Sequence, residues 1–169
     1  MKYKVLAIIC CSFFMIISLN AFAQNTNSNP SHNFEVGISQ NMLLGTNSVF
    51  NCVGAYCGYG LTKDIKIMME FDWGRQLLKD GCYAQIMSLS LAHEIWMKDS
   101  FSFQLWCGPG VIRSTMPNDT YSYAACAVLG LQPRLNFSRN GFVGFDARAV
   151  LGRYSTLGSF IGVTWGIRL

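Results

Sequence analysis

Histidine and serine are the residues of this chain that could support acyl-transfer chemistry. The sequence holds two histidines, His32 and His93, and a serine nucleophile needs a histidine base within hydrogen-bond reach. Ser88 and Ser90 stand an odd number of positions before His93, so in an extended strand they point to the opposite face. We therefore predict no catalytic residues and no enzyme.

Cysteines and acidic residues give equally little support to metal or disulfide chemistry. Five of the seven cysteines follow position 23, an odd number without CxxC spacing or accompanying histidines. Disulfide scaffolds are usually short, loop-rich and even in cysteine number, so these five are interpreted as small hydrophobic residues. Asp72, Asp80 and Asp119 are too few to indicate a calcium site. No cofactor or metal site is predicted.

The N-terminal segment has the pattern of a signal peptide. Lys2 and Lys4 precede an apolar run over 5–19, and Ala21-Phe22-Ala23 supplies the small-x-small pattern of a cleavage site. The run is shorter than the ~20 residues of a membrane-spanning helix. The next ten residues are uncharged and rich in asparagine, which favours a flexible lead-in. The predicted organisation is a signal peptide (1–23), a flexible lead-in (24–33) and one barrel domain (34–169).

The composition excludes two broad classes of protein. Hydrophobic residues make up 51% of the 169 residues and charged residues only 13%, against roughly 25% charged in an ordinary soluble domain. Such a chain is neither intrinsically disordered nor a highly charged nucleic-acid binder. Its net charge of +4 includes Lys2 and Lys4, so the mature chain is nearly neutral.

Strict alternation of apolar with polar or small residues recurs along the mature chain. A period of two predicts β-strands, and no run of 18 apolar residues occurs that would predict a transmembrane helix. The eight predicted strands cover 34–42, 52–61, 65–74, 83–95, 101–108, 121–132, 143–152 and 161–169.

The two faces of these strands differ sharply in composition. The apolar face carries no Asp, Glu, Lys or Arg, whereas the other face carries eight charges and 12 of the 16 glycines. A soluble sandwich or a lipocalin-like barrel would expose a glycine-rich surface without benefit. A closed eight-strand barrel has an interior just wide enough for side chains, where glycine makes room for large neighbours, and lipid requires an apolar exterior. We predict an all-β, eight-stranded antiparallel up-and-down transmembrane β-barrel.

The connections and aromatic residues agree with a membrane barrel. Short connections alternate with longer ones of about five to seven residues, as in outer-membrane barrels with short periplasmic turns and longer external loops. Aromatic residues fall at both expected membrane interfaces. The outer band is predicted to hold Trp73, Tyr83, Tyr121 and Tyr123, and the inner band Tyr59, Phe101, Phe103 and Phe137.

The last strand carries a family resemblance. IGVTWGIRL, apolar at every second position up to Leu169, resembles the C-terminal strand of bacterial outer-membrane β-barrels, although that family usually ends in an aromatic residue. The mature chain looks like a small OmpA/OmpX-type barrel and is most similar to the short porin-family barrels of the Bacteroidetes. The resemblance implies a location in the cell outer membrane and contact with its lipid. It also implies recognition of this strand by the barrel-assembly machinery.

Charged residues on the inward face are predicted to pair, because isolated charges in a narrow interior are costly. Closure should bring Glu35 beside Arg168, Arg148 should reach Glu70 or Asp72 across the lumen, and Lys66 should pair with Glu94. The alternative is that these groups only contact trapped water. The predicted lumen charges are Glu35, Lys66, Glu70, Asp72, Glu94, Asp146, Arg148 and Arg168.

The predicted function is a monomeric barrel with a structural or envelope-maintenance role, a closed polar lumen and no nucleic-acid partner. Large side chains such as Trp106, Tyr56 and Met68 are expected to help block that lumen. The alternative is a ligand- or partner-binding barrel that acts through its short extracellular loops, and a lipid-modifying barrel enzyme ranks third.

Overall fold

Eight β-strands account for nearly all of the residues that the computed structural model describes, which are 34–45, 48–77, 81–98, 100–115, 120–137, 140–152 and 158–169. Within these ranges no helix is long and apolar enough to cross a membrane. The predicted signal peptide and lead-in lie outside them, so that division stays a prediction. The strands are β1 (Phe34–Gly45), β2 (Ser48–Gly60), β3 (Ile65–Gln76), β4 (Tyr83–Lys98), β5 (Phe101–Thr115), β6 (Tyr121–Asn136), β7 (Gly141–Gly152) and β8 (Gly158–Arg168).

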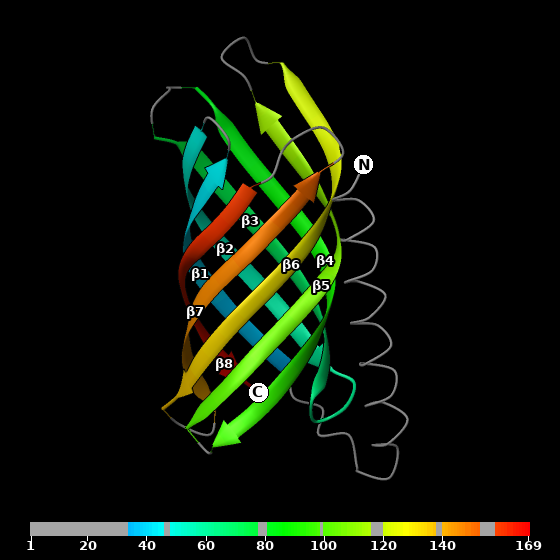
Figure 1. The fold of residues 1–169 in the computed structure, drawn as a ribbon, viewed down its shortest axis with the longest axis vertical. Coiled ribbons are helices and arrows are strands. Elements are labelled where there is room, and N and C mark those ends of the chain that lie inside the picture. The colour runs from blue at the N-terminus through cyan, green and yellow to red at the C-terminus, as the bar shows by residue number, and fades with distance from the viewer. Residues whose placement is uncertain are drawn as a thin grey trace.

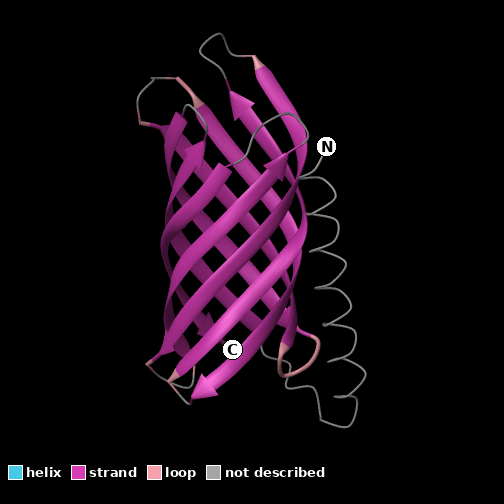
Figure 2. Ribbon diagram, in the orientation of Figure 1, coloured by secondary structure: helices cyan, strands magenta, loops and turns pink. Residues whose placement is uncertain are grey.

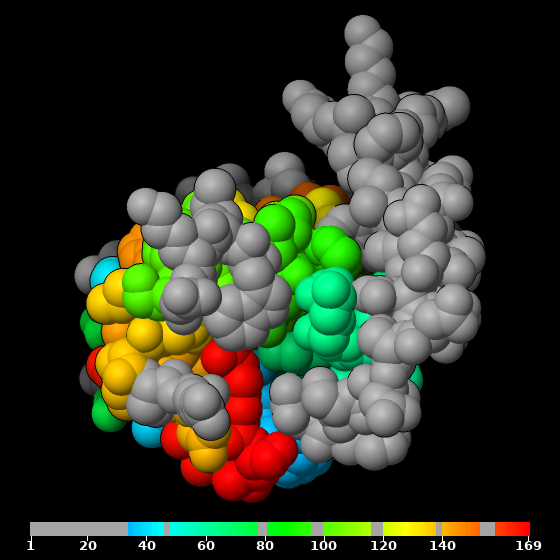
Figure 3. All heavy atoms as spheres, turned by 90° about the horizontal axis from the view of Figure 1, so that it is seen from below, coloured from blue at the N-terminus to red at the C-terminus, as the bar shows by residue number. Residues whose placement is uncertain are grey.

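The strands close into a barrel of antiparallel neighbours. Each strand pairs with the next along the chain, and β8 returns to pair with β1. Figure 1 shows the strands tilted around the barrel axis, and Figure 2 shows that strands form the whole described wall. From below, the red last strand lies beside the blue first strand (Figure 3). The predicted eight-strand antiparallel up-and-down barrel is confirmed.

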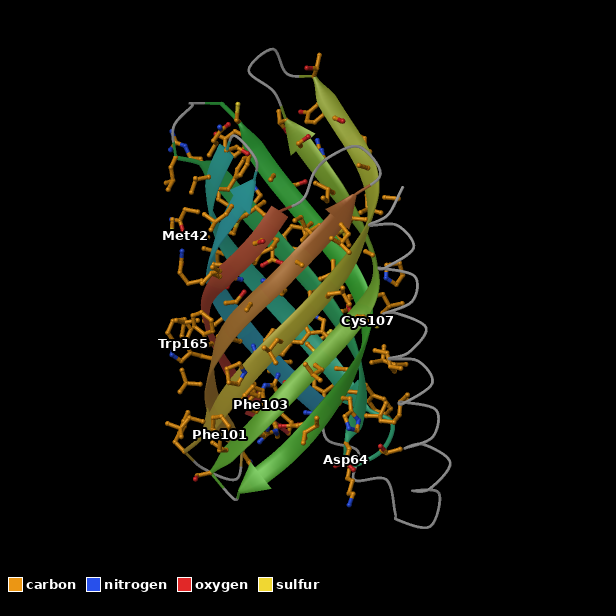
Figure 4. All side chains as sticks on the ribbon, viewed as in Figure 1. Met42, Asp64, Phe101, Phe103, Cys107 and Trp165 are labelled. Atoms are coloured by element: carbon orange, nitrogen blue, oxygen red, sulfur yellow. The ribbon has the colours of Figure 1, made fainter. Side chains whose placement is uncertain are left out.

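One face of every strand lines the lumen and the other faces outward, because side chains alternate along a strand. Outward apolar residues are exposed around the circumference, from Ile38 on β1 to Trp165 on β8. Figure 4 shows Met42 and Trp165 pointing away from the barrel. Inward residues are mostly buried, and many of them are polar or charged. The outside of this barrel is thus more apolar than its inside.

Aromatic rings mark both ends of the outer surface. The end of the barrel where β1 begins and β8 ends is called the turn end here. The opposite end is called the loop end. Trp73 stacks on Tyr83 near the loop end, with ring centroids 5.7 Å apart. Phe101 and Phe103 meet edge to face at 5.2 Å near the turn end, low in Figure 4. Both bands contain the residues predicted for them.

The outward face also carries two arginines, which corrects the prediction that it holds no charge. β3 and β5 both continue past their predicted ends, and this continuation adds Arg75 and Arg113 to the outward face. Arg75 pairs in register with Tyr83, and Arg113 with Gln85. The two strands therefore extend to the level of the aromatic band, where long cationic side chains can reach a polar phase.

Glycines make room for the largest side chains of the lumen, as predicted. A Cβ on Gly130 would overlap the Trp106 ring, and one on Gly37 would overlap the Tyr56 ring. Gly166 leaves similar space for Phe142. These three close approaches explain why the inward face alternates glycine with aromatic residues.

Candidate functional site in the barrel lumen

Five buried charged residues gather near the turn end of the lumen and are called the turn-end cluster. They come from five different strands, so only closure of the barrel brings them together. Lys66 Nζ lies 2.6 Å from Glu35 Oε2 and 2.6 Å from Glu94 Oε2. The members of the turn-end cluster are Glu35 (β1), Lys66 (β3), Glu94 (β4), Arg134 (β6) and Arg168 (β8).

Two arginines, one on β6 and one on β8, complete this cluster. Arg134 Nη2 lies 2.8 Å from Glu35 Oε1, and Arg168 Nη2 lies 2.6 Å from Glu94 Oε1. Both guanidinium groups also lie over the Phe142 ring, with their Cζ atoms 4.1 and 5.1 Å from its centroid. Three cations thus share two carboxylates, and the turn-end cluster carries a formal charge of +1.

Arg134 is a buried lumen charge that was not predicted from the sequence. Its side chain is 0% exposed, and it continues the inward face of β6 two residues after Gln132. The predicted strand ended at Gln132, before Pro133, whereas β6 runs to Asn136. Pro133 points outward, so it does not interrupt the inward row. The spacing of two from Gln132 to Arg134 was the available signal.

A second group of charges lies farther up the lumen and is called the central cluster, made of Glu70, Asp72, Asp146 and Arg148. Arg148 binds Asp72 with both terminal nitrogens, at 2.6 and 3.0 Å. Its Nη2 also lies 2.9 Å from Asp146 Oδ2, and its Nη1 lies 3.7 Å from Glu70 Oε2. One cation therefore faces three carboxylates, and the central cluster carries a formal charge of −2.

Neutral donors support the carboxylate that is farthest from Arg148. Trp106 Nε1 donates a hydrogen bond of 3.2 Å to Glu70 Oε2, and Ser88 Oγ donates one of 3.1 Å to the same atom. Hydrogen bonds from neutral donors stabilise a buried carboxylate without adding charge. Glu70 is thus held mainly by neutral donors and Asp72 by a bidentate ion pair.

The predicted pairs are present, but as parts of networks. Lys66 contacts Glu94 and Arg148 contacts Asp72, both at 2.6 Å. Glu35 and Arg168 are register neighbours across the closure, but Arg168 Nε is 3.5 Å from Glu35 Oε2, farther than the contacts that Lys66 and Arg134 make. The reason is the narrow lumen, which lets side chains from the far wall reach the same carboxylate.

Apolar layers accompany the two clusters. An aromatic layer contacts both, since Phe142 lies beneath the turn-end arginines and Trp106 donates to Glu70. Its buried members are Tyr56, Met68, Ala92, Trp106 and Phe142. An apolar plug made of residues nearer the loop ends of their strands comprises Leu43, Cys52, Ala84, Ile86, Cys126, Val128, Val150 and Phe160. Side chains therefore fill the lumen in successive layers.

The residues considered for catalysis and metal binding lie apart. Ser88 and Ser90 are buried in the lumen, whereas His93 lies on the outward face, in register with Ile65 and Leu105. Across the described part of the chain, no group of three His, Cys, Asp or Glu residues could hold a metal ion. The five described cysteines form no disulfide with one another.

Comparison with known proteins finds likeness in structure alone. No family model matches the sequence, and no curated protein matches it either. The N-terminal β-barrel domain of Pseudomonas aeruginosa OprF matches with a TM-score of 0.65 at 16% identity, over 80% of this chain and 97% of that one. The attachment invasion locus protein Ail of Yersinia pestis matches with a TM-score of 0.60 at 10% identity, over 81% and 97%.

A third solved structure has the same architecture. Neisserial surface protein A (NspA) matches with a TM-score of 0.59 at 9% identity, over 81% of this chain and 95% of that one. At such identities the likeness concerns the fold. The chain has the fold of the small eight-stranded outer-membrane β-barrels.

Proposed function

We propose that this chain is an outer-membrane barrel that supports the cell envelope structurally and keeps its own lumen closed. The observation that carries the proposal is the reversal of polarity between its two surfaces. Nine charged side chains are buried in the lumen, while large apolar side chains are exposed around the wall. In lipid this arrangement places the apolar surface in a medium that needs no hydrogen bonds, and closure leaves no unpaired strand edge.

The location is tested by separating the periplasm, inner membrane and outer membrane of cells that produce the full chain. We expect the protein in the outer membrane, and a folded form that migrates faster on a gel before boiling than after it. Recovery in the soluble periplasmic fraction would overturn the proposal, because a protein with this exterior would then need a different apolar partner.

Closure of the lumen is tested separately by electrical recording. The two ion clusters and the apolar layers fill the barrel, and eight strands leave space only for side chains. We expect no large, steady conductance from the folded protein in planar lipid bilayers. Porin-sized channels would contradict a closed lumen while leaving the membrane location intact.

The apolar outer face of the final strand, β8, favours its recognition during assembly of the barrel in the membrane. Its outward residues Val163, Trp165 and Ile167 are exposed, and Leu169 closes the barrel by donating its backbone N–H to Phe34 O at 2.6 Å. We propose that the assembly machinery of the outer membrane binds this strand before its ladder with β1 closes the barrel. Replacing Trp165 and Ile167 together by Asn is expected to lower the yield of folded protein in cells. Unchanged yield would remove this part of the proposal.

A further inference from the structure

Among the strand residues whose side chains the structure describes, only two charged residues stand at outward positions, and both are arginines. Arg75 lies on β3 and Arg113 on β5, and both stand near the loop end. Charged side chains on a lipid-facing surface are destabilising near the middle of a bilayer and tolerated near its interfaces. We therefore infer that the level of both arginines on the barrel wall coincides with a membrane interface.

Aromatic and amide side chains hold Arg113 in place. Its Cζ lies 4.2 Å from the centroid of the Tyr121 ring and 5.9 Å from that of Tyr123. Its Nη1 donates a hydrogen bond of 3.4 Å to Gln85 Oε1. Its Nε has no hydrogen-bond partner among the described residues. Because this Nε is itself buried, the terminal nitrogens are the donors that could meet a ligand. The guanidinium is thus oriented by its neighbours, and the tyrosine rings and the Gln85 amide do not neutralise its charge.

Arg75 stands on the other side of the intervening strand β4. It is exposed and pairs in register with Tyr83, which stacks on Trp73. Two strand spacings separate β3 from β5, which amounts to roughly 10 Å. The two arginines and the rings around them therefore form one continuous patch across β3 to β6. This rim cluster consists of Trp73, Arg75, Tyr83, Gln85, Arg113, Tyr121 and Tyr123.

We propose that the rim cluster binds the phosphate groups of a phosphorylated lipid in the outer leaflet. Arginine recognises phosphate through its planar fork of donors, and aromatic residues of membrane barrels lie at head-group level. The apolar wall continues below the cluster through Val111 and Met87, both about half exposed, where acyl chains would lie. The proposal rests on the proposed outer-membrane location, with the loop end facing outward.

The turn end has no comparable cationic patch among the described residues. Its exposed Lys63 lies in a turn, and its Nζ is 3.9 Å from Asp64 Oδ2, so the lysine charge is largely offset. Lys63 therefore lies at the opposite end of the barrel from the rim cluster. It supplies a matched control, because Lys63→Gln removes one exposed positive charge outside the rim cluster.

The test measures lipid binding to the folded full chain in neutral detergent by native mass spectrometry. The probes are lipid A, a disaccharide lipid with two phosphates, and its fully dephosphorylated form. The proteins are the wild type, the double variant Arg75→Gln/Arg113→Gln, and Lys63→Gln. Each preparation is first shown to come from the outer membrane and to migrate as a folded barrel, so failure of the proposed function appears before any lipid is added.

We expect the wild type and Lys63→Gln to prefer lipid A over its dephosphorylated form. The double variant should bind lipid A about tenfold or more weakly, since each basic residue near an anionic surface contributes to attraction. Equal binding by the double variant, or no preference for the phosphorylated lipid in the wild type, would overturn the proposal. Displacement of the lipid by millimolar inorganic phosphate would also overturn it, by showing a site for small anions.

Discussion

The two charge clusters of the lumen both combine buried cations with buried carboxylates, but their charges are balanced in opposite ways. In the turn-end cluster, three cations share Glu35 and Glu94, so each carboxylate has more than one partner. In the central cluster, Arg148 alone serves three carboxylates. Burial of an ion is costly in both places. The comparison teaches that the turn-end cluster is redundant, whereas the central cluster depends on one side chain.

The clusters also differ in how their uncompensated charge is accommodated. The turn-end arginines lie over the Phe142 ring, whose face attracts cations. The excess negative charge of the central cluster instead meets neutral donors, from Trp106 and Ser88 to Glu70. The aromatic layer between the clusters thus presents a ring face to the cations of the turn-end cluster and an N–H donor to a carboxylate of the central cluster.

The largest effect is expected from Arg148→Met. The substitution leaves three buried carboxylates without a cation, and breaking a buried ion pair in this way costs about 3–5 kcal/mol. The measurement is urea unfolding of the barrel in detergent, with the fraction folded read from the gel shift. A cost below about 1 kcal/mol would show that water rather than Arg148 compensates these carboxylates.

A smaller loss is expected from Arg134→Met in the turn-end cluster. Lys66 and Arg168 remain beside Glu35 and Glu94, so we expect a loss of about 1.5–3 kcal/mol, the range for a hydrogen bond to a charged group. Unfolding is followed under the same conditions as for Arg148→Met. Arg134→Lys serves as the control that keeps the charge. If Arg134→Met costs as much as Arg148→Met, the turn-end cluster is not redundant.

The aromatic layer that joins the clusters can be disturbed without changing charge. Gly130→Ala would press a methyl group into the Trp106 ring and should destabilise the barrel by about 1–3 kcal/mol through overpacking. Gly58→Ala is the matched control, since its nearest contact would be 3.4 Å, to Met68 Cγ. We expect Gly130→Ala, but not Gly58→Ala, to change the fluorescence of Trp106 in the folded barrel. Equal behaviour of the two variants would contradict the close packing described for Trp106.

The smallest effect is expected from Glu70→Gln. The amide oxygen can still accept from Trp106 and Ser88, while the central cluster loses one of its excess negative charges, so stability should change by less than about 1 kcal/mol. Double-mutant cycles with Arg148→Met should give a larger coupling energy for Asp72→Asn than for Glu70→Gln. Equal coupling energies would mean that Arg148 interacts no more strongly with Asp72 than with Glu70.

The sequence predicted the strands better than their ends. Alternation located all eight strands, because one wall surface must suit lipid and the other the lumen. The predicted ends were too early where the pattern changed character, after Gly74 on β3, after Gly108 on β5 and before Pro133 on β6. Arg75, Arg113 and Arg134 lie beyond the predicted strand ends, so the alternation did not assign them to a face of the barrel. Arg75 and Arg113 belong to the rim cluster, and Arg134 belongs to the turn-end cluster.

The sequence by itself determined the fold class, the inward face and the inventory of most lumen charges, because these follow from a local period of two. The strand order also predicted three of the charge pairs, but only the tertiary structure decided how these pairs join into two networks and which partner each charge approaches most closely. Strand tilt and stagger place residues from opposite walls at the same height, so Arg134 reaches Glu35 from ninety-nine positions away and Arg168 prefers Glu94 over its register neighbour. Contacts across a closed lumen depend on the whole circumference, and no local pattern carries that information.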